Sequence, residues 1–242
     1  MTYIDDKAKQ SVIINKADMV WSVADKLTGA YKPHEYGLVI LPLTVLRRLD
    51  CALEPTREKV LRKYEEVKDF PDNIKETLLR EASGLQYYST SPKGMRSVID
   101  NPKDVGNALR RFIATFSPNV QNILAEFKIY QQSDRMEEAS GGQGGLLFTV
   151  IDEITSIKND LSPDVVSDID MGYIFEEIIR KFSESYNEDA GQHYTPRDAI
   201  DLMVEILIRP EDMAATKETV RTVLDPACGT GGMLSEATDY MS

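Results

Sequence analysis

The chain has 242 residues, a formal net charge of −12 and two cysteines, Cys51 in a helical pattern and Cys228 in a glycine turn. Its length and its 42% hydrophobic residues allow one large or two modest domains, and two cysteines do not make a disulfide framework. The acidic balance argues against tight DNA binding by the chain alone, because such binders carry a basic face. No signal peptide or membrane-length apolar run is found, which predicts a cytoplasmic protein.

The first part of the chain is predicted to be helical. Apolar residues at helical spacing indicate a helix that ends at Gly29, and Pro33 fits the first position of a further helix. Between residues 36 and 53 apolar residues occupy most sides, which is typical of a helix buried in a bundle. Arg47 and Arg48 interrupt this run. Two arginines alone favour a solvated helix edge; contact with a partner or DNA is the alternative.

Charged helices and proline-marked helix starts follow. Residues 56–68 and 73–81 are predicted to form surface helices, because their apolar residues make only a modest stripe. Asn101 and Ser117 each precede a proline, and a capping residue before a first-turn proline predicts a helix start. No convincing alternation of period two appears here, so this part of the chain is expected to contain no strands.

Residues 140–145, with the sequence Ser-Gly-Gly-Gln-Gly-Gly, are the clearest break in the chain. They predict a mobile loop, a domain hinge or both. A phosphate cradle is the alternative, but the polar residues 135–140 precede the glycines where an apolar strand would be needed. Helices are expected over residues 146–157 and 171–186.

A glycine-rich turn follows a short apolar run between residues 222 and 234. Thr222 to Leu224 is predicted as a central strand that stops at Asp225, and a helix is expected after the turn. Strand, glycine turn and helix N-terminus present backbone N–H groups in a cradle for the anionic or polar part of a nucleotide-like ligand. On geometry alone the ligand could be a dinucleotide, a phosphate or S-adenosylmethionine. The spacing argues against the first two, because a dinucleotide site needs a third glycine further on and a phosphate loop needs Gly-Lys-Ser/Thr.

A second helix start lies upstream of this turn. Thr195 can cap the helix, Pro196 fits its first turn, and Asp198 can reach back to the cap. The free N–H groups of such a first turn suit a carboxylate. Apolar residues at helical spacing then predict a buried stripe formed by Ile200, Met203, Val204 and Leu207.

Both stretches resemble motifs of the amino-methylating DNA methyltransferases. Asp225 to Gly231 resembles motif I, Asp-Pro-x-Cys-Gly-Thr/Ser-Gly, which binds S-adenosylmethionine. Gly191 to Arg197 is similar to the Gly-x-Phe/Tyr-Thr-Pro motif that closes the other side of the cofactor site in the adenine-modifying group. Residues 17–53 and 171–176 resemble the N-terminal helical domain and the Gly-x-Ile-Tyr-Glu stretch of the modification subunit of type I restriction-modification systems.

The resemblance implies a mainly α chain with two domains. A helical bundle domain is expected over residues 1–145, followed over residues 146–242 by the truncated start of a Rossmann-like α/β S-adenosylmethionine-dependent methyltransferase domain. The implied activity is methyl transfer from S-adenosylmethionine to the exocyclic amine of adenine in DNA. The implied partners are a specificity subunit that reads the bases, a restriction subunit and a second modification subunit, with DNA bound through the assembled complex and no membrane.

The resemblance also implies the cofactor-binding residues. Cys228 is expected to pack beneath the cofactor, because transfer to an exocyclic amine needs no covalent intermediate, and His193 is expected to line the pocket. No metal site is predicted, since His34 and His193 stand far apart without ligand spacing around them. The expected cofactor-binding residues are Gln192, His193, Tyr194, Thr195, Pro196, Arg197, Asp225, Cys228, Gly229, Thr230, Gly231 and Gly232.

The catalytic motif of this family does not occur in the sequence. That motif, Asn/Asp-Pro-Pro-Tyr/Phe, holds the target amine and stacks the flipped base. The acid that contacts the cofactor ribose is expected about 20 residues after motif I, beyond Ser242. The chain is therefore expected to be the N-terminal part of a longer subunit, without catalytic residues of its own and inactive alone. A non-enzymatic helical module that assembles with a DNA-specificity partner, and a nucleotide-binding domain of another function, are the alternatives.

Overall fold

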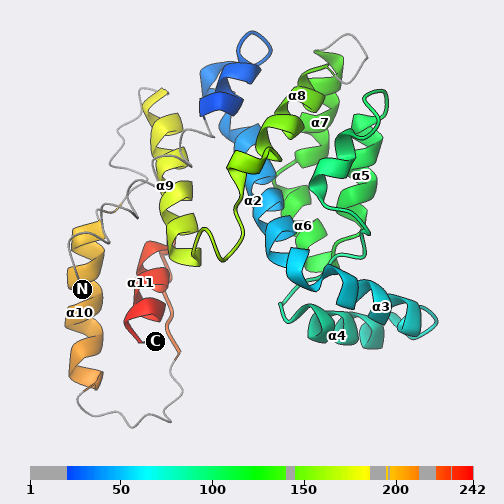
Figure 1. The fold of residues 1–242 in the computed structure, drawn as a ribbon. Coiled ribbons are helices and arrows are strands. Elements are labelled where there is room, and N and C mark those ends of the chain that lie inside the picture. The colour runs from blue at the N-terminus through cyan, green and yellow to red at the C-terminus, as the bar shows by residue number, and fades with distance from the viewer. Residues whose placement is uncertain are drawn as a thin grey trace. The chain divides into compact units, whose positions relative to one another are not determined.

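The computed structural model describes residues 21–139, 145–185, 195, 197–212, 222–229 and 231–241. Over these ranges the regular elements are all helices, and only two isolated bridges occur, Thr28 with Tyr31 and Ser89 with Phe116 (Figure 1). The prediction of a mainly helical chain is confirmed. None of the helices found in these ranges is both long and apolar enough to cross a membrane.

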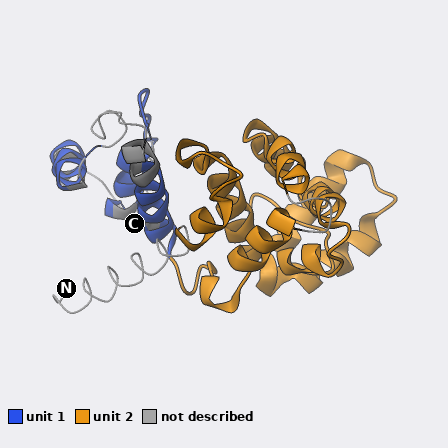
Figure 2. Ribbon diagram, turned by 90° about the horizontal axis from the view of Figure 1, so that it is seen from above, with its two compact units in different colours: residues 1–13, 167–242 blue, residues 14–166 orange. Residues whose placement is uncertain are grey.

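The helices form two compact units, one of described residues up to Val166 and one of described residues from Ser167 onward (Figure 2). The domain boundary predicted between residues 145 and 146 stays a prediction. After a helical segment at residues 21–27, the elements in chain order, with η for short 3-10 helices, are η1 Pro33–Glu35, α2 Gly37–Leu53, η2 Glu54–Thr56, α3 Arg57–Val67, α4 Asp72–Ser83, η3 Met95–Ile99, α5 Val105–Ala114, α6 Pro118–Glu126, α7 Ile129–Glu138, α8 Gly145–Ile154, η4 Ile157–Asn159, α9 Asp168–Ser185, α10 Arg197–Asp212 and α11 Gly232–Tyr240.

Helix α2 lies in the core of the larger unit, where it contacts α7 and α8. Val39, Ile40, Leu43 and Leu46 are each at most 1% exposed. A fully buried side chain of this kind contributes about 2 kcal/mol relative to an exposed one. The apolar run between residues 36 and 53 thus forms a buried helix, as predicted.

The prediction of a solvated edge at Arg47 and Arg48 is wrong. Nη1 of Arg48 donates hydrogen bonds to the carbonyl oxygens of Leu161, at 2.6 Å, and Val166, at 2.7 Å. Nη1 of Arg47 lies 3.4 Å from the buried carboxylate of Asp50. Arg48 therefore connects α2 to the segment at residues 161–166, more than a hundred residues away in sequence. Arg47 pairs with an acid of α2 itself.

Two predicted helix starts have different outcomes. Ser117 is the N-cap of α6, and Pro118 is its first residue, as predicted. The helix expected after Asn101 begins only at Val105. The side chain of Asn101 accepts a hydrogen bond from the backbone N–H of Lys103 at 3.2 Å, so it forms a turn of its own and does not cap a helix.

Arg135 of α7 connects three parts of the larger unit. Its guanidinium donates to both carboxylate oxygens of Glu35, at 2.8 and 3.0 Å, and lies 4.0 Å from the ring centre of Tyr31. The hydrogen bond from Arg135 is the main cause that lowers the pKa of Glu35 to about 2. Burial raises the pKa of Tyr31 to about 12. A bidentate pair of this kind fixes the η1 turn against α7.

We expect the contribution of Glu35 to stability to depend on pH. Because its pKa in the folded state is about 2, against an ordinary value of 4.5, the stabilisation is fully present above pH 4.5 and is lost as the pH falls towards 2. At pH 7 the substitution Glu35→Gln should lower the free energy of unfolding by at most about 1 kcal/mol, since the pair is partly solvated. Urea unfolding of both proteins at pH 7 and pH 3 measures this.

The exposed Glu81→Gln variant is the control, and it should match the parent chain at both pH values. A deficit for Glu35→Gln that stays constant between pH 7 and pH 3 would contradict the expectation.

In the smaller unit, α10 and α11 lie side by side (Figure 1). Ile200, Val204 and Ala237 form their shared core. The predicted stripe of α10 is only half right, because Met203 is 39% and Leu207 64% exposed. Helix α11 covers only the side of α10 that carries Ile200 and Val204, so the adjacent apolar positions remain at the surface.

The predicted strand at residues 222–224 does not form. Val223 is 45% and Leu224 84% exposed, so both side chains remain at the surface of the described part of the chain. A strand requires a neighbouring strand to satisfy its N–H and C=O groups, and the described part of the chain contains none. The helix that follows, α11, does pack on α10 and contacts α9.

Candidate functional site

The glycine turn at residues 225–231 joins this extended segment to α11. Gly229 has φ +52° and Gly231 φ +83°, a backbone conformation that residues with a Cβ rarely adopt. The N–H of Gly231 donates to the carbonyl oxygen of Cys228 at 2.7 Å. The N–H of Ala227 donates to Oδ1 of Asp225 at 3.0 Å, so the predicted acid shapes the turn itself. The turn is therefore tight, as its glycines suggest.

The turn has one open side and one packed side. A Cβ at Gly229 or Gly231 would meet nothing within 4 Å. A Cβ at Gly232 would lie 2.7 Å from Cδ1 of Ile200 in α10 and 3.6 Å from Oε1 of Glu176 in α9. Gly232 thus provides the close approach of α11 to its neighbours. Among the described residues, the open space lies on the side of Gly229 and Gly231.

The first turns of α10 and α11 come together at this point. Ile200 lies in the first turn of α10, directly after the Thr195–Arg197 stretch, and it packs against Gly232, the first residue of α11. The N-terminal ends of both helices are therefore neighbours. Unsatisfied N–H groups at helix starts attract anionic groups, so a pair of adjacent helix starts is suited to an amino-acid carboxylate or a similar anion. Thr195 itself is exposed.

Several predicted site residues fall outside the described ranges: Gln192, His193, Tyr194, Pro196 and Thr230. The side chain of Arg197 is likewise not described, although its backbone begins α10. The thiol of Cys228 is exposed. Over the described ranges, no cluster of three or more histidine, cysteine or acidic residues could hold a metal ion. Cofactor binding by these residues stays a prediction.

Two residues that frame the turn were not among the predicted site residues. Ile200 was predicted as part of a buried stripe, which is correct, but its place behind Gly232 follows only from the packing of α10 on α11. Glu176 is only 8% exposed. The sequence indicated this residue only as the last position of the 171–176 stretch, which resembles a motif of the family.

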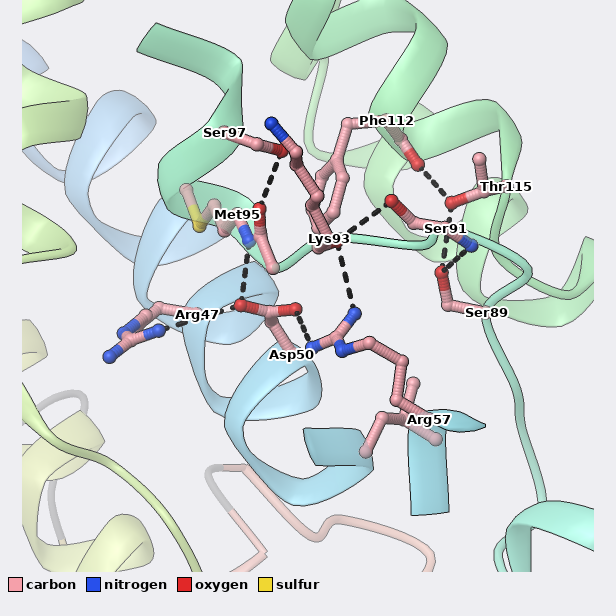
Figure 3. Close-up of polar contacts among 12 residues, drawn as sticks. Arg47, Asp50, Arg57, Ser89, Ser91, Lys93, Met95, Ser97, Phe112 and Thr115 are labelled. Carbon is pink, nitrogen blue, oxygen red and sulfur yellow. Dashed lines mark hydrogen bonds and ion pairs between the residues drawn. The ribbon is translucent and has the colours of Figure 1, made fainter. Parts of the chain in front are cut away.

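A second polar site occurs in the larger unit. A pocket of about 630 Å³ lies between the end of α2, the η3 loop and α8. At its base Asp50, 2% exposed, accepts hydrogen bonds from Nη2 of Arg57 at 2.9 Å and from the N–H of Met95 at 2.8 Å, beside Arg47 (Figure 3).

The charges of this pocket compensate one another. Lys93 pairs with Asp100 at 2.8 Å, and Arg96 pairs with Asp152 at 2.9 Å. A Cβ at Gly94 would lie 3.2 Å from a carboxylate oxygen of Asp50, so glycine allows this loop to approach α2 closely. Because the acidic and basic groups are matched, the arrangement connects α2 to the η3 loop and offers no surplus of positive charge to a polyanion.

Comparison with known proteins agrees with the division into two units. The family model described as the HsdM N-terminal domain matches residues 16–154, and the model described as N-6 DNA Methylase matches residues 166–242.

Two curated relatives are similar over most of the chain. It is 26% identical over 239 residues to the type I restriction enzyme MjaIX methylase subunit of Methanocaldococcus jannaschii, covering 93% of this chain and 39% of that protein. It is 28% identical over 178 residues to the type I restriction enzyme EcoEI methylase subunit of Escherichia coli, covering 70% of this chain and 34% of that protein. The chain therefore spans little more than a third of the length of these relatives.

Proposed function

Because this chain belongs to the HsdM N-terminal domain family and continues into the start of an N-6 DNA methylase domain, we propose that it is the N-terminal part of a type I modification subunit. The resemblance expected from the sequence is confirmed at this level. The proposed activity is transfer of the methyl group of S-adenosylmethionine to the exocyclic amine of adenine in DNA. The observation that carries the proposal is the adjacency of the two helix starts at Ile200 and Gly232.

The residues of the turn fit S-adenosylmethionine. The open side leaves room for a ligand against backbone N–H groups, because nothing lies within 4 Å of a Cβ position at Gly229 or Gly231. The first turn of α10 is suited to the carboxylate of the cofactor's amino-acid portion. When bound, the cofactor supplies the activated methyl group. We assign Thr195, Asp225, Gly229 and Gly231 to holding it, together with the other predicted residues of both motifs.

The base-binding and recognition functions are proposed to lie elsewhere in the assembly. No Asn/Asp-Pro-Pro-Tyr/Phe tetrapeptide occurs in the 242 residues, so the groups that hold the target adenine would come from the rest of the subunit. A specificity subunit would read the DNA sequence, and a restriction subunit and a second modification subunit would complete the complex. Such a complex acts on cellular DNA, which supports a cytoplasmic location.

We expect the 242-residue chain alone to transfer no methyl group. The same sequence, extended to the length of its relatives and combined with its specificity subunit, should methylate adenine. Incorporation of a radiolabelled methyl group into adenine-containing DNA measures both, and the Gly231→Asp variant of each protein supplies the background. Incorporation by the chain alone above that background would contradict the prediction. Assembly of the extended subunit without any methylation would instead favour a non-enzymatic interaction module.

We also expect the isolated chain to bind DNA weakly and without sequence preference. Its net charge of −12 repels the phosphate backbone, and the basic residues of the η3 pocket are already paired with acids. Fluorescence anisotropy with a labelled duplex should show only binding that disappears as salt rises to physiological strength. A sequence-specific complex at nanomolar protein in physiological salt would show that this chain supplies DNA contacts itself.

A further inference from the structure

Glu176 is a buried acid beside the glycine turn. Across the described residues, the charged side chains below 9% exposure are Asp50 and Glu176. Asp50 is explained by its two arginines and the Met95 N–H. Glu176 lies in α9, on another face of the helix than the buried Ile174 and Ile178. Burial of a carboxylate is unfavourable unless the surroundings stabilise its charge, so its position requires a physical reason.

The start of α11 lies beside this carboxylate. Oε1 of Glu176 lies 3.6 Å from the position that a Cβ at Gly232 would take, and Gly232 is the first residue of α11. The N-terminal end of a helix carries partial positive charge and N–H groups without intrahelical partners. A carboxylate placed against that end is stabilised by it and in turn holds the first turn of the helix in place.

The side on which Glu176 lies separates it from the ligand. Glu176 and Ile200 both lie on the packed side of the turn, at Gly232, whereas Gly229 and Gly231 have open space within 4 Å. A ligand held by the turn occupies the open side. On this geometry the backbone of the turn would lie between Glu176 and such a ligand.

We propose that Glu176 is a positioning residue, which fixes the first turn of α11 and thereby the arrangement of the glycine turn that binds the cofactor. The identity of that cofactor as S-adenosylmethionine rests on the function proposed above. Helix α9 becomes part of the cofactor site in this way, through Glu176 and the backbone of the turn.

The test uses two variants. Glu176→Gln keeps the shape of the side chain and removes its charge. Glu176→Asp keeps the charge but moves it away from the start of α11, because the side chain is one methylene shorter. Asp201→Asn is the matched control, because Asp201 is an exposed acid on α10 in the same unit. In the complete subunit, calorimetry should show that Glu176→Gln weakens S-adenosylmethionine and S-adenosylhomocysteine equally, by about threefold to tenfold. The control should bind both ligands as the parent does.

Hydrogen exchange on the 242-residue chain provides a readout that needs no ligand. Amides of residues 229–235 should exchange faster in Glu176→Gln and Glu176→Asp, with those of the larger unit unchanged. If Glu176→Gln prevents α10 and α11 from packing together, the milder variant Glu176→Asp tests the proposal instead. Calorimetry and hydrogen exchange are then measured on that variant.

Three outcomes separate the possibilities. Unchanged affinities and exchange in both variants would overturn the proposal. Weaker binding of S-adenosylmethionine with normal binding of S-adenosylhomocysteine would also overturn it, because the acid would then act on the sulfonium directly. A parent subunit that binds neither ligand would contradict the proposed function instead, and the exchange rates alone would decide the role of Glu176.

Discussion

Replacing Asp50 by alanine should lower the free energy of unfolding of the larger unit by about 3–5 kcal/mol, as is usual when one member of a buried ion pair is removed. The side chains of Arg47 and Arg57 are only 14% and 12% exposed, and both would lose their carboxylate. The N–H of Met95 would lose its acceptor inside the protein. The expected loss of free energy therefore comes from two largely buried arginines left without their carboxylate and one backbone N–H left without its acceptor.

Urea unfolding followed by tryptophan fluorescence measures this loss selectively. The chain has a single tryptophan, Trp21, and it belongs to the larger unit. Asp152→Ala is the matched control, because Asp152 also pairs with an arginine in the same pocket but is 49% exposed. It should cost less than about 1 kcal/mol. Equal unfolding midpoints for the two variants would show that the Asp50 cluster is no more important than a surface pair.

Replacing Gly231 by valine should abolish cofactor binding in the complete subunit, by at least about a hundredfold, while the rest of the fold persists. Gly231 has φ +83°, and a β-branched residue is a genuine outlier in that region, so the turn must change its path. The added side chain would also enter the open side of the turn, where no atom lies within 4 Å. Calorimetric titration with S-adenosylmethionine measures the effect.

Gly84→Val is the matched control for backbone strain. Gly84 has φ +71° and open space around its Cβ position, but it ends α4 in the other unit. That variant should lose some stability and bind the cofactor normally. Normal affinity in Gly231→Val would refute the assignment of the turn, and equal loss in both variants would attribute the effect to general destabilisation.

The helices of the larger unit were largely predictable because their signals are local. Ser117 and Pro118 act within one helix turn, and the apolar run of α2 specifies burial from its own composition. The failures involve long-range partners. Arg48 is held by the carbonyl groups of Leu161 and Val166, and nothing near residue 48 in the sequence indicates them. Asp50 went unnoticed for the same reason, since the loop at Met95 completes its site.

The candidate site was predictable in composition and not in arrangement. The glycines of the turn specify its positive φ angles locally, and Thr195 with Pro196 marks the start of α10 in the sequence. That Ile200 packs on Gly232, and that Glu176 lies behind it, depends on how three helices pack. The segment at residues 222–224 shows the converse, because strand-forming residues make a strand only when another strand lies beside them.

The exposed apolar side chains of α10 also have a consequence for the chain during its synthesis. Leu202, Ile206 and Leu207 are 58%, 62% and 64% exposed. Because N-terminal domains usually fold first on the ribosome, the larger unit can complete its core before α10 has emerged. From then on the nascent chain consists of a folded larger unit followed by a helix whose apolar face is exposed to solvent. Chaperones can bind such an exposed apolar surface, and neighbouring chains can aggregate through it. The yield of folded protein should therefore depend on growth temperature and expression rate.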